Sequence, residues 1–90
     1  MIYGEIKQER KRQIDKFGEQ SRSLIEWCVI LGEEVGEANR AALEYHFKDE
    51  YPDIYIEPKQ QLIRNFRKEL IQIAAVCVAA VEDINKNHYQ

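Results

Sequence analysis

Cysteine is scarce in this chain of 90 residues, and neither sign of charge is collected into a block. Cys28 and Cys77 are isolated from each other within apolar runs and lack the paired spacing of a zinc site or a secreted disulfide framework. We expect both to be reduced and buried in packing. Thirteen Lys and Arg against sixteen Asp and Glu give a net charge of −3. Nucleic-acid polymers and anionic membranes need a concentrated basic patch, so neither is an expected partner.

Long uncharged runs are missing as well. No segment reaches the roughly 18 apolar residues of a membrane-spanning helix, and no apolar run resembling a signal peptide follows Met1, Ile2 and Tyr3. We therefore expect a protein that stays in the cytoplasm. The chain has room for one domain, residues 1–90, and a monomer this short buries only about 60 to 65% of its unfolded surface. Self-association, as a homodimer or a homotetramer, is expected to add burial.

Proline, the strongest helix breaker, occurs twice, and both copies lie in the segment 46–59. This segment mixes aromatic residues with alternating charge and fits neither a helix nor a strand template, so we expect a connecting loop that is long enough to act as a lid. The rest of the chain has helical periodicity and predicts three helices with the approximate bounds 4–17, 24–45 and 60–87. The expected fold class is therefore all-α.

Short signals mark the expected helix ends. Gly18 is suited to end the first helix in a left-handed conformation, and Ser23 with Glu26 completes a capping box at the start of the second. In the third helix, the segment LIQIAAVCVAAV (70–81) contains one polar residue, Gln72. A helix that is apolar on nearly all sides needs neighbours on all sides, and three helices supply only two. We therefore expect an antiparallel three-helix unit that completes a larger bundle by homo-oligomerisation.

Two of the glutamates are expected to point into the core. On a helical wheel of the second helix, Glu34 falls inside the apolar arc, Glu37 at its margin and Glu33 outside it. On the third helix, Glu69 falls in the middle of the apolar arc, and Gln72 lies at its edge. An unpaired buried carboxylate costs several kcal/mol, so each inward acid requires a compensating cation.

Two origins of that cation remain open from the residues alone. Glu34 or Glu69 could form a buried salt bridge with an arginine such as Arg10, Arg40 or Arg67. Alternatively, two facing helices that each present a carboxylate, with a second oxygen ligand three residues later, can converge on a hard cation such as Mg²⁺ or Mn²⁺. Redox iron is less suitable, because neither helix core contains the histidine of carboxylate-bridged iron sites.

Two short strings carry a resemblance to a known family. EEVGE at 33–37 and KELIQ at 68–72 resemble the EExxE and ExxD motifs of the MazG-like all-α nucleoside triphosphate pyrophosphohydrolases. The segment ERKRQIDKFGEQ (9–20), followed by IEWCVILGEEVGEANRAALE, is similar to the small MazG-like proteins of phages and bacteria. The resemblance implies a MazG-like helical bundle that uses Mg²⁺ to cleave an NTP or dNTP between its α and β phosphates, giving a nucleoside monophosphate and pyrophosphate.

The resemblance also implies roles for particular residues. Glu34, Glu37 and Glu69 match metal ligands of the family, and Gln72 stands where the family has aspartate. A glutamine carbonyl can still bind Mg²⁺ but brings no negative charge, which favours weaker binding or fewer ions. Glu33 matches the first glutamate of EExxE and, with Glu34, is a candidate catalytic residue that activates water; a solvated position is the alternative for Glu33.

Three further residues are candidates for binding substrate. Lys16 and Gln20 belong to the polar end of the first helix and could contact phosphate or base, although such an end is often only solvated. Trp27 lies on the same side of its helix as Glu34 and could stack on a base, with core packing as the alternative. Asp83 also faces inward but lies about 16 Å along the helix from Gln72, too far to share its metal. The alternative function is a non-catalytic module that senses nucleotides or binds proteins, in which Gln72 marks a lapsed site.

Overall fold

The computed structural model describes residues 1–89, and its secondary structure is helical throughout. Three α-helices, α1 (Ile2–Phe17), α2 (Leu24–Phe47) and α3 (Lys59–Asp83), are followed by a π-helical turn, η1 (Ile84–His88). The described residues contain no strand, which confirms the all-α prediction. The expected third helix is correct in extent, but its α-helical hydrogen bonding gives way to the wider π pattern after Asp83.

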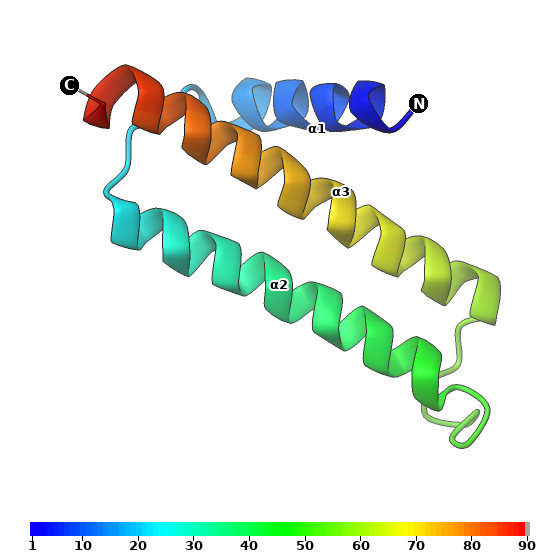
Figure 1. Ribbon diagram of the computed structural model, residues 1–90. Coiled ribbons are helices and arrows are strands. Elements are labelled where there is room, and N and C mark those ends of the chain that lie inside the picture. The colour runs from blue at the N-terminus through cyan, green and yellow to red at the C-terminus, as the bar shows by residue number, and fades with distance from the viewer. Residues whose placement is uncertain (90) are drawn as a thin grey trace.

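The three helices lie side by side with α3 in the middle (Figure 1). α2 and α3 form an antiparallel pair, and α1 lies on the other side of α3 and points in the same general direction as α3 (Figure 1). α3 packs against both neighbours, whereas α1 and α2 do not pack against each other within residues 1–89. α3 therefore forms the floor of a groove that α1 and α2 border.

The turn between α1 and α2 follows the predicted signals. Gly18 adopts φ 74° and ψ 178°, a backbone region that essentially only glycine occupies. The predicted capping box is present: Ser23 Oγ accepts a hydrogen bond from the Glu26 amide at 3.2 Å, and Glu26 Oε1 accepts one from the Ser23 amide at 2.9 Å. These contacts fix where α2 begins and in which direction it leaves the linker.

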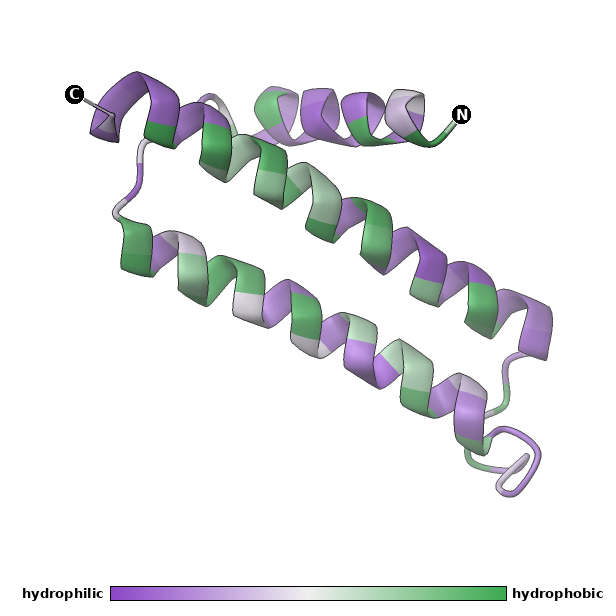
Figure 2. Cartoon of the chain, viewed as in Figure 1, coloured by the Kyte–Doolittle hydropathy of each residue, from purple (hydrophilic) through white to green (hydrophobic). Residues whose placement is uncertain are grey.

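The apolar core is small and lies between α2 and α3. Its buried members are Trp27, Ala38, Ala41, Leu62, Ala75, Val76 and Ala79. Leu62 is the most enclosed of the large side chains, at 1% exposure, whereas α1 contributes no buried residue. Figure 2 shows the same division, with apolar residues running along α2 and α3 and a mostly hydrophilic α1.

The apolar arcs of α2 and α3 are only partly covered in the single chain. Leu24 is 57% exposed and Val35 is 40% exposed, although both lie in the predicted apolar arc. The prediction that Cys28 and Cys77 are buried is wrong for this chain, because both are free and exposed. The physical reason is that α2 has one helical neighbour, so α3 covers one flank of the arc and leaves the other flank open.

The predicted loop is confirmed between α2 and α3, with bounds that differ by one or two residues at each end. The Tyr51 amide donates to the Phe47 carbonyl of α2 at 3.0 Å, and Lys59 Nζ of α3 pairs with Asp49 at 2.8 Å, so the loop is bonded to both helices. Within residues 1–89, no helix combines the length and the apolar character needed to cross a membrane.

Candidate metal centre

Three glutamates from the two central helices converge on one point. Glu34 and Glu37 lie one turn apart on α2, and Glu69 faces them from α3. Each offers one carboxylate oxygen, and these three atoms all lie within 4.8 Å of one another. The antiparallel pairing of α2 and α3 produces this convergence, because it brings the EExxE segment of one helix against the KELIQ segment of the other.

Two carboxylate oxygens of the cluster have no hydrogen-bond partner. Glu34 Oε2 and Glu69 Oε2 are both buried and unpaired within the described residues. A buried polar atom without a partner costs roughly 1 to 3 kcal/mol, and more when it is charged. A water or a cation can satisfy such atoms, and oxygen donors with negative charge suit a hard divalent cation. The cluster therefore fits a cation such as Mg²⁺ on its own geometry.

The raised pKa values of Glu34 and Glu69 also favour a bound cation. Burial raises the pKa of Glu34, and the charges of Glu37, Glu9 and Glu33 raise it further. Burial also raises the pKa of Glu69, followed by its hydrogen bond with Glu37 and the charges of Glu37 and Glu34. Without a cation, both carboxyl groups are therefore harder to ionise than an ordinary glutamate.

The salt-bridge alternative is not what the structure contains. Arg10 pairs with Glu82 at 3.0 Å, and Arg67 pairs with Glu5 at 2.6 Å. Arg40 forms no salt bridge within the described residues, and no salt bridge there includes Glu34 or Glu69. The negative charge of the cluster is therefore not neutralised by a bonded arginine.

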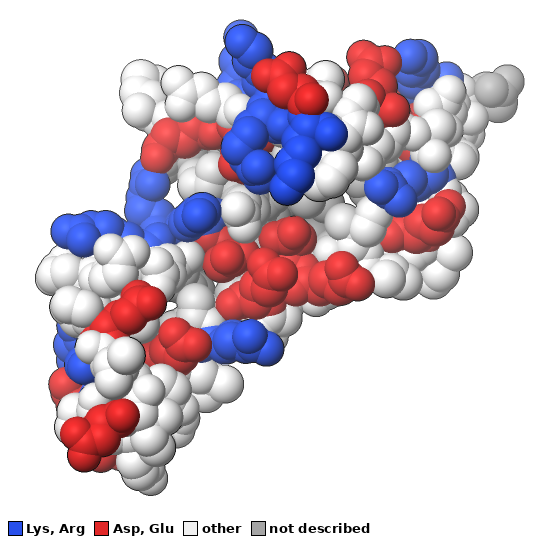
Figure 3. Space-filling view, turned by 180° about the vertical axis from the view of Figure 1, so that it is seen from behind, with Lys and Arg blue, Asp and Glu red and all other residues white. Residues whose placement is uncertain are grey.

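A pocket of about 400 Å³ opens in the groove, and of the three glutamates of the cluster it is lined by Glu34 and Glu37 but not by Glu69. Its lining comes from all three helices and from the α1–α2 linker: Glu9, Arg10, Arg12, Gln13, Lys16, Phe17, Gly18, Gln20, Arg22, Trp27, Ile30, Glu34, Glu37, Gln72, Val76 and Ala79. The view from behind shows acidic side chains gathered near the middle of this face, with Lys and Arg next to them (Figure 3). Acids and bases thus share one concave surface, which suits an anionic ligand bound together with a cation.

Helix α1 supplies a pair that the sequence analysis missed. Glu9 and Arg12 both line the pocket, and Arg12 Nε donates to Glu9 Oε1 at 2.9 Å. Gln13 Nε2 donates to the other Glu9 oxygen at 3.4 Å. The charge of Arg12 also lowers the pKa of Glu34, against the stronger effects that raise it. The i, i+4, i+7 spacing of Glu9, Gln13 and Lys16 was the sequence signal for this polar face.

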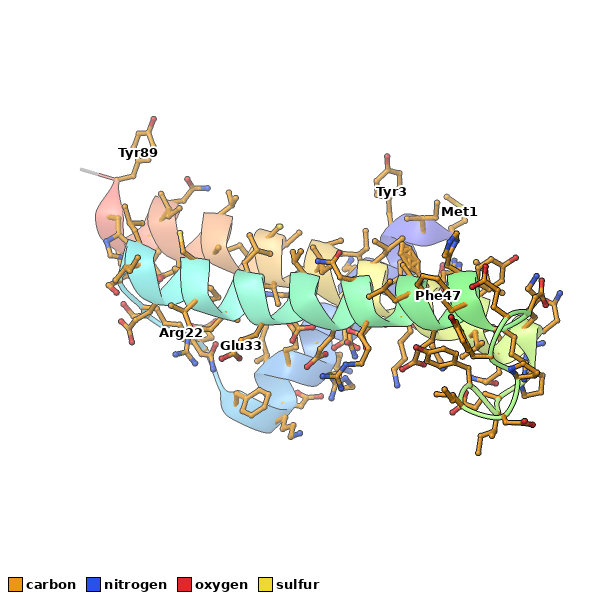
Figure 4. The ribbon with its side chains drawn as sticks, turned by 90° about the horizontal axis from the view of Figure 1, so that it is seen from below. Met1, Tyr3, Arg22, Glu33, Phe47 and Tyr89 are labelled. Carbon is orange, nitrogen blue, oxygen red and sulfur yellow. The ribbon has the colours of Figure 1, made fainter. Side chains whose placement is uncertain are left out.

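Most of the predicted site residues lie together. Gln72 is half-buried and lines the pocket with Glu34 and Glu37, and Lys16, Gln20 and Trp27 line it as well. Glu33 does not line the pocket; it is exposed on the side of α2 on which Arg22 also lies (Figure 4). No residue of the α2–α3 loop lines the pocket, so the loop does not border the site as a lid would.

Trp27 is primarily a core residue. It is 6% exposed, and its indole Nε1 donates to Asp83 Oδ2 at 2.7 Å. The Arg22 guanidinium carbon lies 5.8 Å from the centre of the indole ring, within the range of a cation–π contact. The core-packing alternative therefore describes the position of this ring, and Arg22 is its polar neighbour in the pocket.

Comparisons of the chain with family models, with curated proteins and with solved structures find no match. Three carboxylate oxygens within 4.8 Å of one another can hold a divalent cation. Four cationic side chains around the same pocket, Arg10, Arg12, Lys16 and Arg22, can bind a polyanion.

Proposed function

We propose that this chain is a Mg²⁺-dependent nucleoside triphosphate pyrophosphohydrolase of the MazG-like type. It would cleave the α–β phosphate bond of an NTP or dNTP to give a nucleoside monophosphate and pyrophosphate. The observation that supports this most directly is the convergence of Glu34, Glu37 and Glu69 with two buried carboxylate oxygens that lack a partner. The similarity of the EEVGE and KELIQ strings to the family motifs supplies the reaction.

The residues that would hold the cation are Glu34, Glu37 and Glu69, with Gln72 as a neutral oxygen donor. Mg²⁺ fits this donor set, and Mn²⁺ prefers the same type of oxygen. When bound, the ion would supply a Lewis acid that offsets phosphate charge and makes water more acidic. Because Gln72 carries no charge, this site favours one ion over two.

The cationic side chains of the pocket would orient the triphosphate. Arg10 and Arg12 are already paired with Glu82 and Glu9, whereas Lys16 and Arg22 form no salt bridge within the described residues. Lys16 is therefore the cation most available to bind phosphate oxygens, and Arg22 is available to other acceptors of the substrate. Holding these groups beside the glutamates would place the scissile phosphate near the cation.

Glu34 is a better candidate than Glu33 for accepting a proton from the attacking water. It lines the pocket, and its raised pKa makes its carboxylate a stronger base than an ordinary glutamate. A carboxylate has two oxygens, so one can contact the cation while the other contacts water. Glu33, which is exposed outside the pocket, would contribute mainly its charge.

We further propose that a second copy of the chain covers the open face of α2 and α3, as a homodimer or a homotetramer. Leu24, Cys28 and Val35 form a stripe on α2, and Cys77 and Val81 lie on an exposed apolar stripe of α3. Burial of these stripes between copies would remove them from water. We assign the protein to the cytoplasm, where exposed cysteines such as these stay reduced.

The direct test is an incubation with each NTP and dNTP plus Mg²⁺, scored for monophosphate and pyrophosphate. Glu34→Gln and Glu69→Gln should each lower turnover by at least about 100-fold, because each removes a charged ligand from the cation. Glu50→Gln, in the exposed α2–α3 loop, is the matched control and should leave turnover unchanged. Turnover that is absent across the panel, or equal in the glutamate variants, would count against the proposal.

The alternative is a non-catalytic module that senses nucleotides or binds proteins, and Gln72 in the aspartate position is the observation that favours it. Calorimetric titration with Mg²⁺ and nucleotide separates the two functions. Binding without hydrolysis supports sensing, and an absence of binding supports a purely structural role.

A further inference from the structure

Asp83, the last residue of α3, is a buried acid whose hydrogen bonds are satisfied. It is 4% exposed, and it accepts from the Trp27 indole at 2.7 Å and from the Arg22 backbone amide at 2.9 Å. Its other oxygen accepts from Asn87 Nδ2 at 2.6 Å. These bonds, that of Arg22 first, lower the pKa of Asp83 and keep the carboxylate ionised. One side chain thus ties together the linker, α2 and η1.

The π-helical turn completes this attachment. In a turn with i→i+5 hydrogen bonds, residues four and five positions after Asp83 lie on its side of the helix. Asn87 occupies the first of these positions, and His88 the second. His88 Nε2 lies 2.7 Å from the Arg22 carbonyl oxygen and 3.7 Å from Asp83 Oδ2. The backbone amide of Arg22 is therefore bonded to Asp83, and its carbonyl is bonded to His88.

The Arg22 backbone, fixed by these bonds, places the Arg22 side chain in the pocket. Arg22 Nε donates to Gln20 Oε1 at 3.2 Å, and the Arg22 guanidinium lies against the Trp27 ring. Gln20, Arg22 and Trp27 all line the pocket, and we call them the linker wall. Asp83 does not line the pocket, so it can act on the pocket only through the residues that it holds.

The linker wall lies away from the metal-binding glutamates. Trp27 and Glu34 both line the pocket and are seven residues apart on α2, which corresponds to about 10 Å along the helix axis. Gln20 Oε1 already accepts one hydrogen bond from Arg22, and most of the remaining hydrogen-bonding groups of the Gln20 and Arg22 side chains are N–H donors. This wall therefore favours a ligand group that presents acceptors.

We propose that Asp83 is a positioning residue that holds the linker wall to receive the nucleobase, and that this wall favours guanine over adenine. The inference rests on the proposed function, since it takes the triphosphate to lie at the glutamates. Guanine presents two adjacent acceptors, O6 and N7, which match the paired donors of an arginine. Adenine presents a donor, its N6 amino group, beside N7 and would oppose the Arg22 donors.

The test measures nucleotide binding rather than turnover. Dissociation constants for dGTP and dATP analogues with an α,β-imido bridge are measured in Mg²⁺ by calorimetry and by the emission of Trp27, the single tryptophan. We expect the dGTP analogue to bind on the order of tenfold more tightly than the dATP analogue. Asp83→Ala should bring this ratio close to one, because it removes the oxygen that accepts from both the Arg22 amide and the Trp27 indole.

Two further variants keep the test decisive. Arg22→Met removes the side-chain donors of Arg22 without changing Asp83, so it should abolish the preference even if Asp83→Ala folds poorly. Glu19→Gln is the matched control, since Glu19 is an exposed residue of the same linker that does not line the pocket. Loss of stability alone would weaken both analogues equally and leave their ratio unchanged. Equal binding of both analogues by the native chain, or a native ratio in Asp83→Ala and Arg22→Met, would overturn the proposal even if hydrolysis is observed.

Discussion

Two kinds of acid place oxygens in the interior, one fully buried and the other half-buried, and the difference between them separates structure from function. Asp83 accepts hydrogen bonds from Arg22, Trp27 and Asn87, and its pKa is lowered. Glu34 and Glu69 each have a buried oxygen without a partner, and their pKa values are raised. A helical wheel places all three acids inward and cannot tell them apart. Their hydrogen-bond partners can, because a satisfied acid stabilises the fold whereas an unsatisfied one requires a ligand.

The largest expected effect is the loss of the satisfied acid. Asp83→Ala leaves the Trp27 indole and the Arg22 amide without an acceptor, so the free energy of unfolding should fall by about 2 to 5 kcal/mol. Urea unfolding followed by Trp27 emission measures this change. A loss below roughly 0.5 kcal/mol, the scale of ordinary surface substitutions, would remove the structural role of Asp83.

The next effect concerns the unsatisfied acids and their ligand. Mg²⁺ at one hundred times its dissociation constant should add about 2.7 kcal/mol to the free energy of unfolding, because it binds the folded chain only. Glu69→Gln should lose most of this gain, whereas Glu50→Gln, in the exposed α2–α3 loop, should keep it. Thermal melts with Mg²⁺ or with EDTA test the point. Equal Mg²⁺ effects in the two variants would show that the cation binds elsewhere.

Gln72 offers a way to strengthen the metal site. Gln72→Asp adds a carboxylate where the resemblance expects one, and the affinity for Mg²⁺ should rise on the order of tenfold with the added ligand charge. Without Mg²⁺, the same substitution should lower the melting temperature, because a further acid joins the cluster. Calorimetric titration measures the affinity, and an unchanged or weaker dissociation constant would place Gln72 outside the set of ligands.

The smallest effect is the cost of the glutamate cluster itself. Without metal, Glu34→Gln should raise the free energy of unfolding by roughly 0.5 to 1 kcal/mol, since it removes like-charge repulsion and a buried charge. The raised pKa of Glu34 in the folded chain means that folding favours its protonated form. The stability that this protonation contributes is present below the ordinary pKa of 4.5 and is lost as the pH rises through the pKa of Glu34 in the folded chain.

Asp83 gives the opposite pH dependence. Its lowered pKa contributes stability above the ordinary value of 3.8, and this contribution is lost as the pH falls towards the folded value. Urea unfolding between pH 3 and pH 8 in EDTA should therefore show a decline above about pH 4.5 that Glu34→Gln reduces. A native profile without that decline would contradict the raised pKa values.

Local signals in the sequence predicted much of the fold. Gly18 and the Ser23–Glu26 capping box placed the α1–α2 turn, and periodicity placed the three helices. The wheels also identified Glu34 and Glu69, because an acid within an apolar arc is visible from one helix alone.

Features that depend on how the helices pack against one another could not be predicted from the sequence. Cys28 lies in an apolar arc, but its burial depends on how many helices cover that arc, which periodicity does not contain. Glu9 and Arg12 look like an ordinary solvated pair on α1 until the fold brings them beside Glu34. The partners of Asp83 come from residues 22 and 27, far away in the sequence, so only the fold reveals that this acid is satisfied.

We propose that the unsatisfied glutamates hold a cation for cleavage between the α and β phosphates. Phosphorus-31 NMR of the reaction of the native chain with dNTPs and Mg²⁺, with Glu69→Gln in parallel, tests this proposal. Deoxynucleoside monophosphate and pyrophosphate are expected as the first products, formed only with the divalent cation and far more slowly by Glu69→Gln. Diphosphate with inorganic phosphate as first products, or equal turnover by Glu69→Gln, would contradict it.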